Sequence, residues 1–220
     1  LDLVLADYYI KTKQYDSATK YLRSALLKNL KKNTKARTMF ILGQIYEYQG
    51  NNERATEQFK SVIKKHPGYE MTFESQMNLA RCHDSEDTTS LMKMFRKMLK
   101  DSKNTEYKDR IFYAMSDVAL KRNNEELGIK YLRQSVATST TNNKQKVKSA
   151  LKVASMLFDN KDYILSQAYY DTVVMTMDRS YPEYDSLLNL SVMLSDLVEN
   201  LTTYQLQDSL LRLVKMDSVS

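Results

Sequence analysis

The residues best suited to chemistry are a single cysteine and two histidines. Cys82 stands directly before His83, and His66 lies earlier in the chain. A thiol beside an imidazole is the pairing that nucleophilic catalysis and zinc binding use. Adjacent residues on a helix point about 100° apart, however, so these two side chains would not converge on one atom. We therefore interpret Cys82 as a small apolar residue of the core.

The other polar residues form no pattern typical of an active site. The sequence contains no HExxH motif, no nucleophile elbow and no glycine-rich phosphate loop. Acidic residues are frequent, but their spacing does not separate a catalytic carboxylate pair from a solvated helix face. We predict no catalytic, cofactor-binding or metal-binding residues, and a protein that is not an enzyme.

The elements that position these side chains are predicted to be helices. The chain has 220 residues, of which only 4 are glycine and 2 are proline. A sandwich, barrel or Rossmann sheet needs many more turn residues, so an all-α fold is expected. No apolar run approaches the roughly 18 residues of a membrane helix. Because Leu1 opens the sequence in place of methionine, we expect a segment of a longer protein.

Charge is distributed unevenly along the chain. The net charge is +6, but residues 1–150 carry 28 basic and 17 acidic side chains, whereas residues 151–220 carry 5 and 10. This split is typical of solvated helix faces, or it indicates that the basic and acidic parts of the chain bind partners of opposite charge. The most basic stretch, residues 28–35, has no interleaved aromatic residue and is weak evidence for nucleic-acid binding.

Residues 36–69 carry a spaced pattern that resembles the tetratricopeptide repeat (TPR). The eight positions of the pattern are occupied by Met39, Leu42, Gly43, Tyr46, Ala55, Phe59, Val62 and Pro67. Such a repeat is two antiparallel helices, with small residues where their backbones approach. Gly43 and Ala55 would take that role, Gly50 would form the turn and Pro67 would follow the second helix.

The pattern recurs with a period longer than the usual 34 residues. The residues at the close-contact position of each second helix are Ala18, Ala55, Leu91, Gly128 and Ser166. Residues 1–180 are thus predicted to form five helix pairs. Residues 181–220 would add a capping pair, with helices at about 183–200 and 203–216. The predicted fold is one continuous domain, a right-handed superhelical solenoid of about six pairs.

The second half of the chain resembles a narrower group. The segments that carry the resemblance include residues 98–101, 107–114, 167–171 and 207–210, together with Tyr181-Pro182. In order and spacing they are similar to the PorW and SprE lipoproteins of the type IX secretion and gliding motility machinery of Bacteroidetes. The resemblance is clearest over residues 91–216.

This resemblance implies a location and partners that composition does not. It implies a lipoprotein anchored at the periplasmic face of the outer membrane, with a lipid anchor outside this sequence. It also implies a scaffold that contacts other components of the secretion system. A generic TPR adaptor in another pathway is the alternative, and an RNA-binding helical repeat is a further one because of the basic residues 1–150.

The expected binding surface is the inner groove lined by the first helix of each pair. The residues at the usual groove positions are Arg37, Phe40, Gln44, Tyr48, Met77, Arg81, Tyr113, Lys121, Lys148, Leu151 and Phe158. Aromatic and arginine side chains dominate interface energies. The lysine and asparagine clamp of chaperone-binding TPR domains is not reproduced, so we predict a different protein or peptide partner and no nucleic acid.

Overall fold

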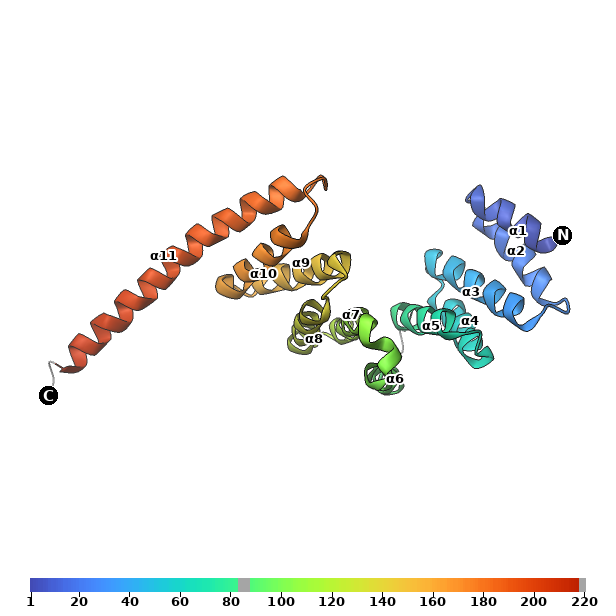
Figure 1. Cartoon of the computed structure of the whole chain (residues 1–220), viewed down its shortest axis with the longest axis horizontal. Helices are drawn as coiled ribbons and strands as arrows, with labels where there is room; N and C mark the ends of the chain where they lie inside the picture. Colours follow the sequence, from blue (N-terminus) through green and yellow to red (C-terminus); the bar gives the residue numbers. More distant parts are fainter. Residues whose placement is uncertain (83–87, 218–220) are drawn as a thin grey trace. The chain divides into compact units, whose positions relative to one another are not determined.

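The computed structural model describes residues 1–82 and 88–217, with side chains placed up to residue 213 (Figure 1). His83 lies outside the described residues. Within them every regular element is helical, which confirms the all-α prediction. The elements are α1 (Asp2–Lys11), α2 (Tyr15–Leu26), α3 (Lys32–Tyr48), α4 (Asn52–Lys65), α5 (Tyr69–Cys82), α6 (Thr89–Lys100), η1 (Ser102–Tyr107), α7 (Lys108–Leu120), α8 (Glu125–Thr138), α9 (Asn143–Asp159), α10 (Tyr163–Thr176) and α11 (Tyr184–Asp217).

The chain divides into two compact units, each of which is described by itself. Unit 1 comprises Leu1–Met94 and unit 2 comprises Phe95–Ser220, so that the boundary falls within α6. The predicted third pair, made of α5 and α6, crosses this boundary. That pair and the single continuous array therefore stay predictions.

Unit 1 contains two helix pairs with the predicted repeat packing. Helix α1 packs on α2 and α3 packs on α4, while α5 continues the stack against α4. The large and small residues of the repeat pattern are buried as expected. The core comprises Ala6, Ala18, Leu22, Leu42, Ile45, Tyr46, Ala55, Phe59, Leu79 and Cys82. Helix α4 ends at Lys65, and the chain leaves through left-handed His66 and then Pro67.

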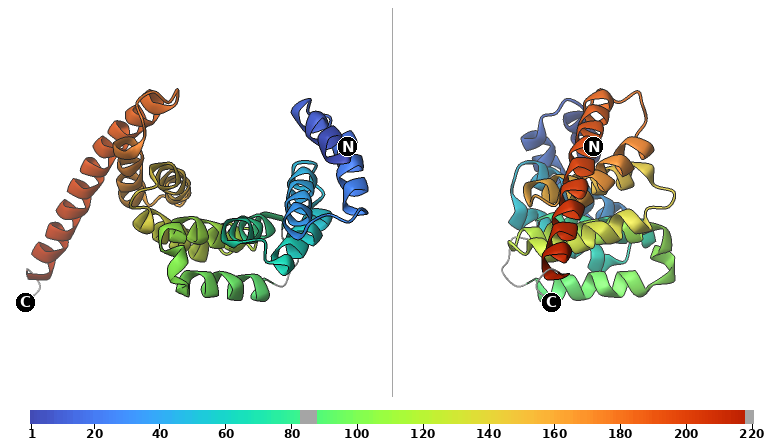
Figure 2. Two further views of the ribbon diagram at one scale, coloured as in Figure 1. Left: turned by 45° about the vertical axis from the view of Figure 1, so that its right-hand side comes forward. Right: turned by 90° about the vertical axis from the view of Figure 1, so that its left-hand side faces the viewer.

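Unit 2 repeats the arrangement with α7 on α8, α9 on α10, and α11 on α10. Its main core joins α8, α9 and α10 and comprises Leu132, Val136, Ala150, Val153, Leu157 and Val173. A second cluster of Ala154, Tyr170 and Leu194 attaches α11 to α9 and α10. The views of Figure 2 show the same stacking order from two further directions. Each unit thus has the stacked helix pairs of a TPR solenoid.

The turns between the two helices of a pair share one backbone conformation. The residue at the centre of each turn is left-handed, with φ between 54° and 75°; these residues are Lys13, Gly50, Asn123 and Lys161. The residue that follows is the N-cap of the second helix. Asn51, Asn124 and Asp162 each accept the backbone N–H three positions later, which caps the helix.

The predicted C-terminal helix pair is wrong, because α11 runs without a break from Tyr184 to Asp217. In the four turns above, the left-handed residue lies five positions before the close-contact residue. A sixth pair with the same period would place Val198 there. A β-branched residue is strained in the left-handed region, and no glycine or proline lies nearby. The chain therefore continues as a helix where the other pairs turn back.

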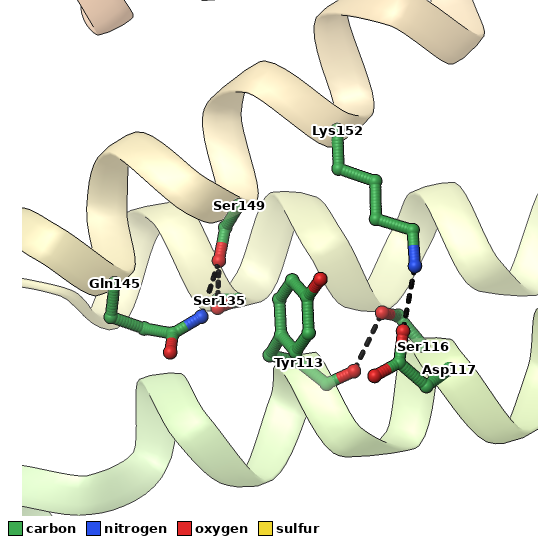
Figure 3. A network of polar contacts seen from close by, with 7 residues as sticks. All are labelled: Tyr113, Ser116, Asp117, Ser135, Gln145, Ser149 and Lys152. Atoms are coloured by element: carbon green, nitrogen blue, oxygen red, sulfur yellow. Dashed lines mark hydrogen bonds and ion pairs between the residues drawn. The ribbon is translucent and has the colours of Figure 1, made fainter. Parts of the chain in front are cut away.

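A buried polar network holds α7, α8 and α9 together in unit 2. The Ser135 hydroxyl donates to the backbone oxygen of Asp109 at 2.7 Å and lies 2.7 Å from the Ser149 hydroxyl. Gln145 Nε2 donates to the Ser149 hydroxyl at 2.9 Å (Figure 3). The Asp109 carboxylate accepts the Ser139 hydroxyl at 3.1 Å. Because these polar groups are paired, their burial does not leave them unsatisfied.

Candidate functional site

The predicted groove residues divide between the two units, six in unit 1 and five in unit 2. In unit 1, Arg37 and Gln44 are both exposed on α3, the helix that also carries Tyr48. Tyr48 is 74% exposed, and its ring packs on Tyr15 with centroids 4.8 Å apart. Phe40 points toward the core, where its ring meets the ring of Phe59 at 5.8 Å.

The first helices of unit 1 are joined by an ion pair. Arg81 Nε on α5 lies 2.7 Å from Glu47 Oε1 on α3, and Arg81 Nη2 donates to Asn78 Oδ1 at 2.6 Å. The guanidinium of Arg81, a predicted groove residue, is thus already bound by side chains of unit 1. Met77 is buried at 6% exposure, so it contributes to packing and offers no open contact surface.

In unit 2 the structure brings two predicted groove residues together. Lys148 Nζ on α9 lies 4.4 Å from the ring centroid of Tyr113 on α7, and Lys152 Nζ lies 5.3 Å from the same ring. Lys152 also pairs with Asp117 Oδ1 at 2.6 Å (Figure 3). We call Tyr113, Asp117, Lys148 and Lys152 the α7–α9 cluster. It combines an aromatic face with two cations and one carboxylate, which suits recognition of a polar polypeptide.

Burial and charge both act on the phenol of this cluster. Desolvation raises the pKa of Tyr113 to about 12, and the negative charge of Asp117 adds to the shift. Both effects disfavour the phenolate. The Tyr113 hydroxyl is therefore neutral over the whole physiological range and can both donate and accept a hydrogen bond.

A difference titration should detect this raised pKa. We expect that replacing Tyr113 with phenylalanine removes one phenolate transition centred near pH 12, above the ordinary value of about 10. The neutral phenol stabilises the fold fully below pH 10, and that contribution is lost as the pH rises through 12. Absorbance at the tyrosinate band would measure the transition. Loss of a transition near pH 10 would contradict the described burial.

A pocket adjoins the α7–α9 cluster. Its volume is about 560 Å³, and it lies between the start of α9, the end of α10 and the turn before α11. It shares Lys148 with the cluster. The remaining lining residues are Asn143, Lys144, Val147, Thr176, Met177, Asp178 and Tyr181. The Ser180 backbone N–H and hydroxyl hold the pKa of Asp178 below its usual value, so this carboxylate of the pocket lining is ionised.

The other predicted residues of unit 2 are more dispersed. Lys121 is exposed just beyond α7, and Leu151 is half-buried against the core of the unit. Phe158 is 39% exposed and packs edge-on against Tyr163 at 5.5 Å. Sequence reasoning missed Lys152 and the pocket residues. The four-residue step from Lys148 to Lys152 places both on one helix face and was the available signal.

Cys82 is buried at 1% exposure in the core of unit 1, as interpreted from the sequence. Among the residues with described placement, no three His, Cys, Asp or Glu side chains lie close enough to hold a metal ion. Over the same residues, no helix combines the length and the hydropathy needed to cross a membrane.

Comparison with known proteins identifies the class of fold. Residues 3–33 and 37–69 each match a family model of the tetratricopeptide repeat. No curated protein sequence matches the chain. The solved structure of PilF from Pseudomonas aeruginosa superimposes with a TM-score of 0.55 at 17% identity, covering 92% of this chain and 85% of that one. The TPR2AB domain of yeast Sti1, in a pHSP90 complex, gives a TM-score of 0.38 at 13% identity, covering 86% and 83%.

The chain is therefore an all-α protein with the helix-pair fold of TPR solenoids, and such repeats suggest a protein-interaction scaffold. More particularly, α1 to α4 contain two segments that match tetratricopeptide repeats. The predicted repeat over residues 36–69 is thus confirmed.

Proposed function

We propose that this protein is a non-catalytic scaffold that binds a polypeptide partner along the α7–α9 cluster of unit 2. The observation that carries the proposal is the contact of Tyr113 with Lys148 and Lys152 across two first helices. Tyr113 and Lys148 are predicted groove residues, and Lys152 lies one turn after Lys148 on the same helix. Nothing in this arrangement supplies a nucleophile with a base beside it. It offers an aromatic surface and donors, which are the components of a binding face.

The partner is proposed to be acidic. Helix α9 carries four lysines before its only acidic residue; they are Lys144, Lys146, Lys148 and Lys152. Lys144 and Lys148 also line the pocket, where Val147, Met177 and Tyr181 provide apolar surface. Carboxylates flanking an apolar side chain would complement this combination of charge and pocket. Because one lysine is paired with Asp117, Lys144 and Lys148 supply most of the attraction.

A binding assay with a defined probe tests the proposal. The probe is a fluorescein-labelled decapeptide of alternating glutamate and leucine with one central phenylalanine. We expect it to bind better than the analogue in which every glutamate is replaced by lysine. Changing Lys148 to glutamate should weaken binding at least about tenfold, equivalent to roughly 1.4 kcal/mol. Fluorescence anisotropy at two salt concentrations would measure both effects.

The matched control is Lys130→Glu, which reverses an exposed charge on the second helix α8. It makes the same change in net charge away from the cluster, so it should alter affinity by less than about twofold. Equal losses for the two variants, or no preference for the acidic peptide, would contradict the proposed face. Circular dichroism of both variants would confirm that the helices are retained.

We further propose that the chain belongs to a lipoprotein of the type IX secretion and gliding system, at the periplasmic face of the outer membrane. The support is the ordered sequence resemblance over residues 91–216 alone, because the comparisons match the repeat fold and not this group. Pull-down with the 220-residue chain from a Bacteroidetes envelope extract tests it. Recovery of secretion-system components is expected. Their absence, with normal secretion after deletion of the gene, would contradict this role and leave a generic TPR adaptor.

A further inference from the structure

The C-terminal half of α11 carries an apolar seam that continues an interface already present in the structure. In the first half of the helix, Leu187, Leu190 and Leu194 pack against the cores of α9 and α10, with Leu194 at 3% exposure. The same alternation of three- and four-residue steps continues beyond them. The residues on this continuation are Leu197, Leu201, Tyr204, Asp208 and Leu211, which we call the α11 seam. Such steps are the heptad spacing of helices that pair side by side.

Within the described residues, the α11 seam has no covering element in unit 2. Leu194 is the last fully buried residue of α11 up to residue 213, and beyond it the helix runs on past the first turn of α10 (Figures 1 and 2). Beyond it, Leu197, Tyr204 and Leu211 are 43%, 69% and 61% exposed. Leu201 between them is half-buried. Exposed large apolar residues gathered on one face of a helix typically mark an interaction surface.

Asp208, the polar residue of the seam, indicates the direction in which two α11 helices would pair. Asp208 is part-exposed, and its carboxylate lies 2.9 Å from Arg212 one turn later. In a parallel pair of identical helices, Asp208 would face Asp208 of the second copy, and the two like charges would repel. In an antiparallel pair, Asp208 faces the Tyr204 ring and hydroxyl of the second copy, while Leu201 faces Leu211. The spacing of positions 201, 204, 208 and 211 is symmetric in this arrangement, so these four layers are filled, and Leu197 lies outside them.

Charge along the helix favours the same direction. Asp196 and Glu199 lie at the start of the exposed half, whereas Asp208, Arg212, Lys215 and Asp217 give its end no net charge. Antiparallel pairing places the acidic start of one helix beside the neutral end of the other. Parallel pairing would place the acidic ends side by side, which is unfavourable.

We propose that the α11 seam pairs with the same seam of a second copy in antiparallel orientation, forming a homodimer. The interaction uses a surface separate from the α7–α9 cluster and goes beyond the proposed partner binding. A two-heptad seam lies at the small end of specific interfaces, so the dimer is expected to form reversibly with concentration.

Sedimentation equilibrium of the 220-residue chain tests the proposal. We expect the apparent mass to rise from the 25.7 kDa of one chain toward twice that value as concentration increases from about 10 μM to about 1 mM. Replacing Leu201 and Leu211 together with glutamate should hold the mass at one chain throughout. A wild-type chain that stays monomeric over this range would overturn the proposal.

The matched control replaces Leu206 and Leu213 with glutamate. Both are exposed leucines of the same helix half, at 62% and 59%, but they lie at the outermost heptad position, away from the seam. This variant should dimerise like the wild type, apart from a small charge effect. Equal dissociation by both double variants would show unspecific apolar association and contradict the seam.

Disulfide trapping distinguishes the two orientations. In a Cys82→Ala background, a mixture of Leu201→Cys and Leu211→Cys chains should form a mixed cross-linked dimer on oxidation. Antiparallel pairing separates position 201 of one copy from position 201 of the other by about ten residues, roughly 15 Å along the helix. Leu201→Cys alone should therefore cross-link little, because a disulfide needs Cα atoms within about 7 Å. Efficient self-cross-linking of Leu201→Cys would overturn the antiparallel orientation.

Discussion

Replacing Phe59 with alanine is expected to lower the free energy of unfolding of unit 1 by about 3–5 kcal/mol. The Phe59 side chain is completely buried and lies in the core that joins the first three helices of the unit to α4. Truncation removes its apolar contacts and leaves a cavity that the packed helices cannot fill. Hydrogen exchange of the α3 and α4 amides would report the loss in unit 1 separately from unit 2.

Phe158→Ala is the matched control for this prediction. It removes the same ring from a site that is 39% exposed in unit 2, so it should cost about 1 kcal/mol or less. A similar loss of protection in both variants would contradict the assigned burial.

Gly43 and Phe59 should also be energetically coupled. A Cβ atom at Gly43 would lie 2.8 Å from Phe59 Cε1, closer than packed atoms approach. Gly43→Ala should therefore cost about 1–3 kcal/mol in the wild type, because the buried ring has no space to move. In the Phe59→Ala background the clash is absent, and the higher helix propensity of alanine should stabilise by up to about 1 kcal/mol. A double-mutant cycle measures the coupling, and additive effects would contradict the close contact.

Replacing Asp109 with alanine is expected to destabilise unit 2 by about 3 kcal/mol. The carboxylate is 1% exposed, and its oxygens accept the Arg110 N–H at 2.7 Å and the Ser139 hydroxyl at 3.1 Å. Truncation leaves that buried hydroxyl with one fewer partner and opens space between α7 and α8. Hydrogen exchange of the α7 and α8 amides would measure the effect.

Asp117→Ala is the control on the same helix. Asp117 pairs with Lys152 on a partly exposed face, where an ion pair contributes about 1 kcal/mol or less. Removing this carboxylate also frees Lys152, so the variant should bind the acidic peptide at least as tightly as the wild type while changing stability little. If Asp117→Ala destabilised unit 2 as much as Asp109→Ala, the buried network would not be the feature that holds α7 and α8 together.

Much of the fold could be predicted because its determinants are local. The spacing of Leu42, Gly43 and Tyr46 against Ala55 and Phe59 encodes one helix pair, and the same spacing recurs at Ala18, Gly128 and Ser166. A repeat needs contacts only with its neighbours, so a pattern of about 37 residues contains the information for one layer of the solenoid. Burial of these positions followed the prediction for the same reason.

The error in the C-terminal helix pair also has a local cause. The apolar stripe of α11 continues on both sides of residue 200, and a stripe predicts a helix without showing where a helix must stop. The sequence shows that position 198 is valine, which does not readily adopt the left-handed conformation. Only the structure shows that each of the four other turns needs a left-handed residue at the equivalent position.

Local sequence was thus sufficient to predict an all-α protein of stacked helix pairs, their period and the core positions. The tertiary structure alone decided which predicted groove residues lie open, which are buried like Met77 and which are paired like Arg81. It also brought Lys152 to Asp117, 35 residues earlier, and left half of α11 beyond its neighbours. The physical reason is that helical periodicity fixes the face on which a side chain lies. The crossing of neighbouring helices then determines what that face meets.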